Sequence, residues 1–376
     1  MAAPEDGSSA ADAAAPDSPR EPAPKAAAPA AEIAGIESVG RAAEILRAGG
    51  LVAFATETVY GLGADACNRE ALHKLYKVKK RPQAHPVIVH LADAEELPLW
   101  AAEVSAHAEK LAAAFWPGPL TLVVRRAAHV PDEVTGGQDT VALRVPRHPL
   151  AQALLAAMRE GVAAGQPVGI AAPSANRFGK VSPTSAEHVR ADLGGDVDLI
   201  LDGGECEVGI ESTIVDVSGE APSILRPGRV TAAQVEKCLN IQLVNASEVS
   251  PAAPGTLPTH YAPRAKARLA KRVQIIEQLA TNRGRRIAVL ALEVSVPRLA
   301  AALTAVESAV PASYAHSLYA NLRRLDATGA DLILIETPPD TPAWAGVLDR
   351  LMRATGGASE TARSRAVAAE AEQGAA

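Results

Sequence analysis

Polar side chains suited to catalysis follow an apolar run near the start of the chain. The run 51–55 ends in Thr56, Glu57 and Thr58, and Gly61 and Gly63 come shortly after it. A short apolar run behind a Gly-Gly pair is typical of a buried strand, and ligands of open α/β sheets gather where strands end. The two glycines predict a tight turn that lets a ligand approach the backbone. These residues indicate either a small-molecule site or a plain strand-to-helix turn capped by threonines.

The same glycines fit the spacing of a dinucleotide-binding fingerprint, Gly-x-Gly-x-x-Ala, with Ala66 as its last residue. That fingerprint needs its first glycine directly after a strand, whereas residues 56–60 intervene here. About twenty residues further on, where an acidic ribose partner belongs, the chain has basic residues instead. The sequence therefore argues against a nicotinamide or flavin site.

A group of cations closes the next predicted helix. Lys79, Lys80 and Arg81 stand before Pro82, which forces the backbone out of the helix. A lysine and a fork-shaped arginine in a loop beside a sheet suit a polyphosphate. The cluster is equally consistent with solvated charge at a helix end, and the pattern leaves both interpretations open.

Two charged or titratable residues lie inside apolar strands. His90 lies near the end of the run 87–91, where a histidine is either a satisfied core residue or a ligand. Arg144 lies within the run 141–145, and burying its guanidinium costs several kcal/mol unless the charge meets an anion. That anion is either a protein carboxylate or a substrate carboxylate.

Further polar residues follow later strands. The run 171–184 carries Ser174, Asn176 and Ser182, and its Gly-Lys pair does not form a Walker loop, because the first glycine of that motif would fall on Ser174. Ser212 follows a Gly-Ile-Glu sequence before another strand, and Arg226 lies at a predicted turn. Together these strand ends favour a pocket for an anionic, hydroxyl-bearing or nucleotide ligand.

The elements that position these residues alternate between strands and helices as far as residue 239. The predicted strands are Leu51–Ala55, Val87–Leu91, Leu120–Val124, Val141–Val145, Val168–Ala171, Leu199–Leu201 and Ile214–Val217. The predicted helices are Arg41–Arg47, Ala71–Val78, Glu103–Phe115, Leu150–Met158, Ser185–Leu193 and Ala232–Leu239. Beyond a proline-rich stretch, strands Arg286–Leu292 and Asp331–Glu336 and helices Val273–Ala280, Leu318–Ala327 and Trp344–Met352 indicate a second, smaller α/β domain. We therefore expect five segments: a disordered tail 1–31, a catalytic domain 32–239, a linker or lid 240–264, a small α/β domain 265–354 and a flexible tail 355–376.

Composition limits the class of protein. The 376 residues carry a formal net charge of -6, which argues against a protein whose main role is to coat nucleic acid. The three cysteines form no CxxC pair, so neither a disulfide framework nor a zinc site is indicated. No apolar stretch reaches about 18 residues and the N-terminus lacks a signal-peptide pattern. We expect a soluble, cytoplasmic protein.

Taken in order, the motifs resemble those of the YrdC-type threonylcarbamoyl-AMP synthases in their longer, two-domain form. The residues that carry the resemblance are Thr-Glu-Thr-Val-Tyr-Gly-Leu-Gly at 56–63, Lys79-x-Arg81, Phe-Trp-Pro-Gly-Pro-Leu-Thr at 115–121, Ser174-x-Asn176, Ser-Pro-Thr at 182–184, Glu-Ser-Thr at 211–213 and His-Tyr-Ala-Pro at 260–263. The resemblance implies a YrdC-like α/β fold, a mixed twisted sheet with flanking helices, followed by a smaller Rossmann-like α/β domain. It also implies a nucleotidyltransferase that makes threonylcarbamoyl-AMP and pyrophosphate from L-threonine, bicarbonate and ATP. A separate enzyme of tRNA threonylcarbamoyladenosine modification would receive the product.

The resemblance also assigns site residues by position. Lys79 and Arg81 would be catalytic, together with Mg²⁺ held by the phosphates rather than by side chains. L-threonine would contact Thr58, His90, Arg144, Ala172 and Ser212, with Arg144 on its carboxylate. ATP would contact Arg81, His85, Thr140, Ser174, Asn176, Ser182, Arg226 and Tyr261.

The chain departs from the usual family pattern in three places. Ala55 replaces a proline, His85 stands where asparagine is common, and residues 255–259 lack the basic or aromatic side chains often found before His260. These differences bear on loop stiffness, on the pH dependence of a nucleotide contact and on the contacts of the lid. A module that binds RNA weakly without chemistry is the main rival interpretation. A hydrogenase-maturation architecture is disfavoured, because the chain has no zinc-finger cysteines and no acylphosphatase-like region.

Overall fold

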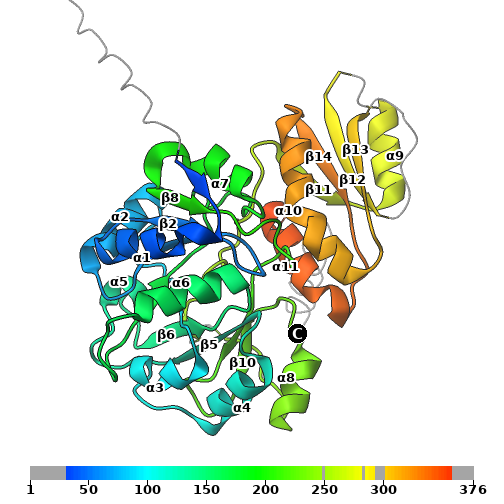
Figure 1. Cartoon of the computed structure of the whole chain (residues 1–376). Helices are drawn as coiled ribbons and strands as arrows, with labels where there is room; N and C mark the ends of the chain where they lie inside the picture. The colour runs from blue at the N-terminus through cyan, green and yellow to red at the C-terminus, as the bar shows by residue number, and fades with distance from the viewer. Residues whose placement is uncertain (1–30, 248–249, 282–283, 293–300, 358–376) are drawn as a thin grey trace, which may run out of the picture.

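A large mixed sheet forms the body of the protein (Figure 1). The computed structural model describes residues 31–247, 250–281, 284–292 and 301–357. Ten strands lie in the order β1-β8-β2-β3-β7-β4-β6-β5-β9-β10. Their bounds are β1 Ile33–Ala34, β2 Val52–Phe54, β3 Gly61–Asp65, β4 Ile88–His90, β5 Leu120–Arg125, β6 Thr140–Arg144, β7 Ile170–Ala171, β8 Leu199–Leu201, β9 Thr213–Asp216 and β10 Ser223–Arg226. Parallel pairs such as β4 with β6 and antiparallel pairs such as β5 with β6 occur in the same sheet.

Helices cover both faces of this sheet, which explains why its strands are apolar on both sides. In β2, Ala53 packs into one core cluster while Val52 and Phe54 pack into the other, because successive side chains of a strand point to opposite faces. The second cluster is closed by α1 Val39–Arg47 and α6 Pro149–Arg159. The first cluster is closed by α2 Arg69–Lys79, α4 Ala106–Phe115, α7 Ala186–Leu193 and α8 Ala232–Leu239. Short helices α3 Leu97–Trp100 and α5 Asp132–Thr135 complete this domain.

A smaller sheet of parallel strands follows in the order β11-β14-β12-β13. Its strands are β11 Lys266–Ala270, β12 Ile287–Leu292, β13 Ala301–Glu307 and β14 Leu332–Glu336. One face packs on α10 Pro311–Ala327 and α11 Ala345–Ala354, and the other packs on α9 Arg272–Thr281. The predicted fold, a large mixed sheet with flanking helices followed by a smaller α/β domain, is thereby confirmed.

The prediction of a tight turn at Gly61 and Gly63 is wrong. Both glycines lie in β3, which pairs antiparallel with β2, so the connecting loop comes earlier and carries Thr58. The glycines are needed for close packing: a Cβ on Gly63 would lie 2.8 Å from the Ile170 side chain, and one on Gly61 would lie 3.2 Å from Ala172 Cβ. Arg226 likewise ends strand β10 instead of lying within a turn. β1, β11 and β13 are further strands that the sequence did not predict.

The described residues of the predicted linker, 240–247 and 250–264, form no helix, and their strand-like pairing is limited to isolated bridges. Residues 1–30 and 358–376, which include most of the two predicted tails, lie outside the described residues. Across the described ranges, no helix combines the length and apolar character needed to cross a membrane.

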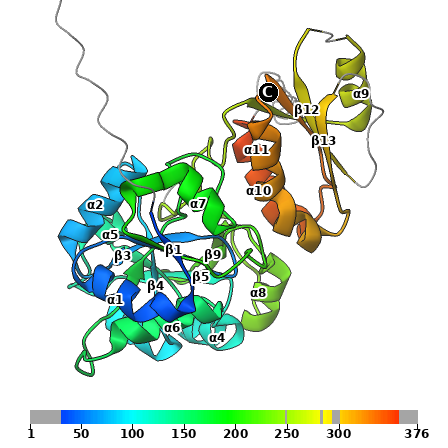
Figure 2. The ribbon, with the colours of Figure 1, turned by 45° about the horizontal axis from the view of Figure 1, so that its top comes forward.

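The two domains meet through α10 and α11, which lie between the small sheet and the large domain (Figures 1 and 2). Arg350 of α11 is fully buried and its Nε donates to Glu211 Oε2 at 2.8 Å. Tyr319 of α10 donates to the same carboxylate oxygen at 2.9 Å. Burial raises the pKa of Glu211, but the nearby Arg350 and Arg226 charges and two hydrogen bonds outweigh it and lower the pKa to about 2. Glu211 is therefore ionised at neutral pH.

We expect Arg350→Ala to destabilise the protein by about 3–5 kcal/mol, because it leaves the buried Glu211 carboxylate without its main partner. Chemical denaturation at pH 7 measures this loss. The exposed Arg41–Glu32 pair supplies the control, since Arg41→Ala should cost no more than about 1 kcal/mol.

The stability that Glu211 contributes is present above its ordinary pKa of 4.5 and is lost as the pH falls towards about 2, because its folded-state pKa is lowered. Arg350→Ala should flatten this acid-dependent loss. An unchanged slope between these pH values would contradict the role given to the pair.

Candidate functional site

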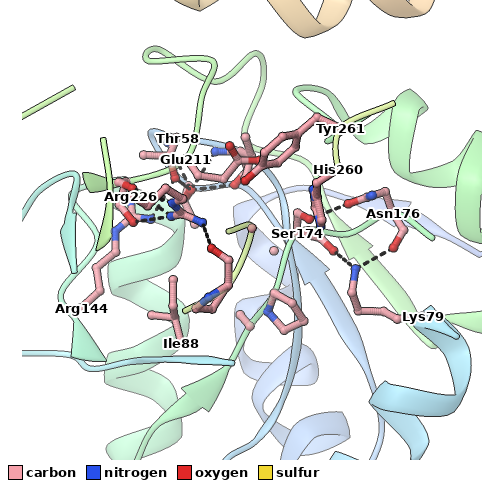
Figure 3. Close-up of a pocket in the computed structure, with 18 of the residues that line it drawn as sticks. Thr58, Lys79, Ile88, Arg144, Ser174, Asn176, Glu211, Arg226, His260 and Tyr261 are labelled. Atoms are coloured by element: carbon pink, nitrogen blue, oxygen red, sulfur yellow. Dashed lines mark hydrogen bonds between the residues drawn. The ribbon is translucent and has the colours of Figure 1, made fainter. Parts of the chain in front are cut away.

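A pocket lies over one face of the central strands of the large sheet (Figure 3). Gly61 of β3, Ile88 and His90 of β4 and Arg144 of β6 form its floor and one wall, together with the residues that follow β7. Ile88 and His90 share a face because they are two residues apart on a strand. The space between the atoms is about 610 Å³, counting solvent at the mouth. Since the sheet is mixed, the pocket lies over a face and not along one edge of strand ends.

Arg144, at the end of β6, finds its anion within the protein. Its Nη2 lies 2.7 Å from Glu57 Oε1, its Nη1 donates to Thr58 Oγ1 at 2.9 Å and its Nε donates to the Gly118 carbonyl at 3.2 Å. Burial acts to raise the pKa of Glu57, but the Arg144 charge and hydrogen bonds outweigh it and leave that pKa below its ordinary value. The buried arginine is thus paired with a carboxylate from the loop between β2 and β3.

His90 lies beside Arg144 in the parallel register of β4 and β6. Its Nδ1 is buried and has no hydrogen-bond partner among the described residues. Burial, and after it the Arg144 charge, lowers the pKa of His90 to about 3. A neutral imidazole, with its unpaired Nδ1 buried, therefore lines the pocket.

Lys79 and Arg81 lie at the C-terminal end of α2, where Lys80 adopts a left-handed conformation with φ 54° and turns the chain. Lys79 is 1% exposed, and its Nζ donates to the carbonyls of Asn176, at 2.6 Å, and Ser174. Burial, reinforced by the Arg81 charge, holds the pKa of Lys79 well below its ordinary value of 10.5. Arg81 Nη2 donates to the Pro86 carbonyl at 2.7 Å. Both cations thus hold neighbouring backbone while lining the pocket.

The opposite wall carries Ser212 and Arg226. Arg226 Nη2 donates to the Ser212 carbonyl at 2.8 Å, and its Nη1 donates to the Pro254 carbonyl of the linker at the same distance. The Ser212 hydroxyl lies 2.7 Å from that of Thr121. Arg226 thereby ties the linker to the loop before β9.

The linker closes the pocket with Pro254, Gly255, His260 and Tyr261. Tyr261 is 1% exposed, has φ 58°, and its hydroxyl has no hydrogen-bond partner among the described residues. A Cβ on Gly255 would lie only 2.0 Å from that hydroxyl, so only glycine fits there. The small domain holds the linker in place, because Arg353 of α11 donates to the Leu257 carbonyl at 2.6 Å. The linker therefore needs few polar side chains of its own to stay over the pocket.

Most of the site residues predicted from the sequence line this pocket: Thr58, Lys79, Arg81, His90, Arg144, Ala172, Ser174, Asn176, Ser212, Arg226 and Tyr261. His85, Thr140 and Ser182 do not. The His85 ring lies 5.5 Å from the Phe178 ring, Thr140 pairs with Arg125 at the start of β6, and Ser182 donates to Glu211 Oε1 at 2.6 Å. Their contacts with a nucleotide stay predictions.

The sequence prediction did not assign several residues that line the pocket: Thr56, Val59, Gly61, Ile88, Pro173, Phe178, Glu211, Pro254, Gly255 and His260. Some carried a signal. Ile88 shares a strand face with His90, and His260 precedes Tyr261 in the same motif. Glu211 stands beside Ser212, although its link to Arg350 is invisible in the sequence.

The charges of the pocket are unbalanced in favour of cations. Its wall carries Lys79, Arg81, Arg144 and Arg226, all buried, against the single carboxylate of Glu211, with Glu57 behind Arg144. Buried cations that exceed their anions favour an anionic ligand. Among the residues that the structure describes, no three His, Cys, Asp or Glu side chains gather as a metal site would require.

Comparison with known proteins finds a matching family model for each of the two domains. Residues 44–228 match a family model of Sua5, YciO and YrdC proteins, described as "Telomere recombination", and residues 230–356 match the model described as "Threonylcarbamoyl-AMP synthase, C-terminal domain". The threonylcarbamoyl-AMP synthase of Bacillus subtilis is 40% identical over 330 residues, covering 85% of this chain and 93% of that protein. The Pyrococcus abyssi enzyme of the same name is 38% identical, covering 84% and 93%. The crystal structure of Pyrococcus abyssi Sua5 complexed with L-threonine superposes with a TM-score of 0.78 at 37% identity, covering 88% of this chain and 97% of that one.

We expect the binding of pyrophosphate in this pocket to take up protons. The pKa of Lys79 is lowered by burial, and an anion beside its Nζ would raise it. Pyrophosphate affinity should therefore increase as the pH falls from the pKa of Lys79 in the complex towards its lower pKa in the free protein. Calorimetry in buffers of different ionisation enthalpy measures the uptake.

Lys79→Met should remove that proton uptake, provided that the variant's thermal melt shows it to be folded. Lys77→Met is the matched control, because Lys77 is exposed at the same helix end and should leave the uptake unchanged. Equal uptake in both variants would exclude Lys79 as its source.

Proposed function

The chain belongs to the threonylcarbamoyl-AMP synthase family and is an enzyme of the nucleotidyltransferase type, and on this basis we propose that it forms threonylcarbamoyl-AMP and pyrophosphate from L-threonine, bicarbonate and ATP. The product would serve the threonylcarbamoyladenosine modification of tRNA through a separate transferase. The observation that carries the proposal is the pocket under the linker, where four buried cations face one carboxylate. Such a pocket suits a ligand set that contains a triphosphate and a free carboxylate.

L-threonine is proposed to bind in the corner formed by Thr58, His90, Arg144 and Ser212. A guanidinium has five N–H donors. Arg144 donates from Nε to the Gly118 carbonyl and from Nη1 to Thr58, and its Nη2 lies at ion-pair distance from Glu57. The other donors can hold the substrate carboxylate. The neutral imidazole of His90 lines this corner and is proposed to pack against the threonine side chain. The presence of Glu57 means that the substrate carboxylate shares Arg144 with a protein carboxylate.

ATP is proposed to bind on the side of Lys79 and Arg81. Lys79 Nζ uses two of its three donors on the carbonyls of Ser174 and Asn176, so one is left for a phosphate. Arg81 donates from Nε and Nη2 to the carbonyls of His85 and Pro86, so its Nη1 is left. Both cations are held before the ligand arrives, which lowers the cost of orienting them.

The reaction proceeds by two displacements. The threonine nitrogen forms a bond to the carbon of bicarbonate with loss of water, which gives an N-carboxylate. An oxygen of that carboxylate then forms a bond to the α-phosphorus of ATP, and the bond to the β-phosphate breaks to release pyrophosphate. Pyrophosphate leaves without a proton from a strong acid, so alignment and neutralisation of phosphate charge by Lys79 and Arg81 suffice.

Mg²⁺ would enter this site on the phosphates of ATP, since the described residues offer no side-chain metal site. When bound there, the ion neutralises charge on the leaving pyrophosphate. Tyr261 and the rest of the linker would shield the carbamate from water.

We expect pyrophosphate release from purified protein supplied with ATP, Mg²⁺, bicarbonate and L-threonine. Omission of either threonine or bicarbonate should reduce the release to background, because each is needed to form the attacking carboxylate. A coupled phosphate assay measures it, and undiminished release without threonine would contradict the proposal.

We expect Arg144→Lys to raise the KM for threonine by about ten- to a hundredfold, because the lysine keeps a charge for Glu57 but loses the paired donors for the substrate carboxylate. The KM for ATP should change much less. Arg81→Ala should show the opposite pattern, with the larger loss for ATP. Arg147→Ala is the control and should alter neither, since the exposed Arg147 side chain pairs with Glu207 and its contact with Glu57 comes from the backbone amide, which alanine keeps. Equal losses for both substrates in Arg144→Lys would remove Arg144 from the threonine site.

A further inference from the structure

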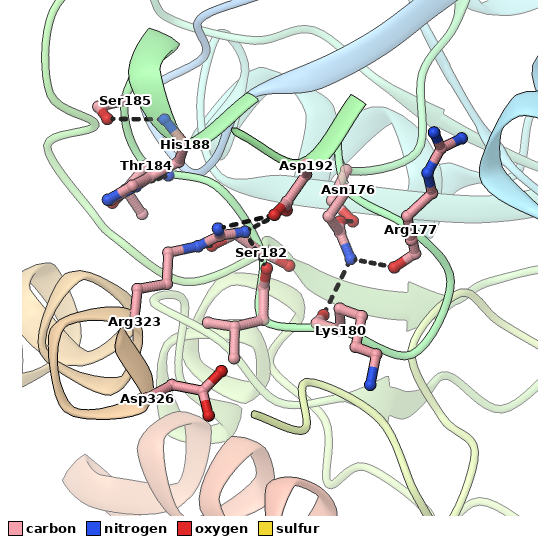
Figure 4. A network of polar contacts seen from close by, with 12 residues as sticks. Asn176, Arg177, Lys180, Ser182, Thr184, Ser185, His188, Asp192, Arg323 and Asp326 are labelled. Atoms are coloured by element: carbon pink, nitrogen blue, oxygen red, sulfur yellow. Dashed lines mark hydrogen bonds and ion pairs between the residues drawn. The ribbon is translucent and has the colours of Figure 1, made fainter. Parts of the chain in front are cut away.

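A second hollow lies between the two domains, and Figure 4 shows polar residues around it, among them Lys180, Asp192 and Arg323. Its walls are the loop at 177–181, helix α7, linker residues 262–264 and helix α10. We call this hollow the interdomain groove. Its cavity volume is about 610 Å³, which is large enough for a small molecule.

Cations dominate the interdomain groove. The residues that line it include five arginines and lysines, Arg177, Lys180, Arg264, Arg323 and Arg324, and only two carboxylates, Asp192 and Asp326. They come from the large domain, the linker and the small domain. Arg177 pairs with Asp196, which lies outside the lining. The remaining local excess of positive charge contrasts with the formal net charge of -6 of the whole chain.

Two of these cations form no close ion pair with a described residue, although the Arg324 charge acts on the carboxyl of Glu307. Arg323 pairs with Asp192, with its Nη1 3.1 Å from Oδ1, and Arg264 pairs with Asp326 at 3.3 Å. The Lys180 ammonium and the Arg324 guanidinium are exposed, and neither forms a hydrogen bond or an ion pair with any residue that the structure describes. Lys180 lies on the loop of the large domain and Arg324 lies on α10, so the two charges belong to different walls.

The interdomain groove and the catalytic pocket share a loop. Asn176 Nδ2 donates to the Lys180 carbonyl at 2.9 Å, while the Asn176 carbonyl accepts from Lys79 Nζ at 2.6 Å. The Ala262 amide donates to the Gly179 carbonyl at 2.9 Å, which fastens the linker to the same loop directly after Tyr261. Asn176 and Phe178 therefore face the pocket, while Arg177 and Lys180 face the groove.

We propose that the interdomain groove is a second anion site that binds a small phosphate-bearing molecule between Lys180 and the arginines of α10. Phosphate groups accept the paired donors of arginine and the point charge of lysine. An anion held by both walls would also bridge the domains across the linker. The five cations line a concave groove, whereas an RNA backbone needs an extended basic surface. Small anions are therefore favoured over RNA.

The test is a titration of the full chain with inorganic tripolyphosphate by calorimetry. Wild-type protein should bind at two sites, the catalytic pocket and the interdomain groove, and Arg81→Ala should weaken only the first. Combining Lys180→Ala with Arg324→Ala should weaken the second site by about tenfold or more, since it removes two charge-assisted contacts. A parallel titration with ADP distinguishes a nucleotide from an inorganic polyphosphate as the source of the phosphate group. Whichever of the two binds more tightly at the second site, the result supports the site.

The matched control combines Arg190→Ala with Lys266→Ala, which removes one arginine and one lysine, one from each domain, outside the groove. It should retain both sites. Equal binding by the two double variants would overturn the proposal, because the effect would then depend on overall charge alone. Single-stranded RNA binding that depends on Lys180 and Arg324, with tripolyphosphate binding unchanged, would overturn it in favour of RNA. Pyrophosphate release by the wild-type protein tests the proposed reaction separately, so the two proposals can fail independently.

Discussion

The carboxylate of Glu211 is the contact on which the arrangement of the whole molecule depends. It stands next to Ser212 in the pocket wall and accepts hydrogen bonds from Ser182, Tyr319 and Arg350. The linker is drawn into the same cluster, because the Tyr261 ring lies between the Tyr319 ring, at 5.8 Å, and the Arg350 guanidinium, at 5.2 Å. Burying this carboxylate with fewer partners would cost free energy. The sheet, the linker and the small domain must therefore come together to supply its hydrogen bonds and opposite charge. The small domain thereby takes part in building the pocket without lining it.

A second constraint governs the cations of the pocket. Lys79, Arg81 and Arg226 are anchored mainly by backbone carbonyls, and Arg144 alone has a close carboxylate partner. Carbonyl partners fix a charged group in position without cancelling its charge, so the pocket keeps its positive potential. The lowered pKa of Lys79 reflects the same potential, since burial and the neighbouring Arg81 both disfavour another charge. Such a pocket can promote phosphoryl chemistry through placement and electrostatics, without a strong general acid.

The loop between Ser174 and Ser182 connects this pocket to the interdomain groove. One side of the loop receives Lys79 and the other side receives Ala262 of the linker and Arg323 of α10. A ligand in the catalytic pocket or in the interdomain groove therefore contacts a loop whose other side is already held by hydrogen bonds. This provides a physical route by which the small domain can influence the site, through contacts that are contiguous in the structure.

The sequence by itself determined the alternation of strands and helices, because apolar runs buried on both faces and capped helices are local patterns. Polar residues at the ends of predicted strands indicated a pocket, and the family resemblance assigned its individual residues, of which His85, Thr140 and Ser182 do not line it. The sequence failed at Gly61 and Gly63, because glycine favours a turn unless close packing against Ile170 and Ala172 requires its missing side chain. Only the tertiary structure decided that Glu57 is the anion of Arg144 and that Glu211, 139 residues before Arg350, is the anion of that arginine. Ion pairs between residues far apart in the sequence leave no periodic pattern, because the two partners meet only when the chain has folded and buried them.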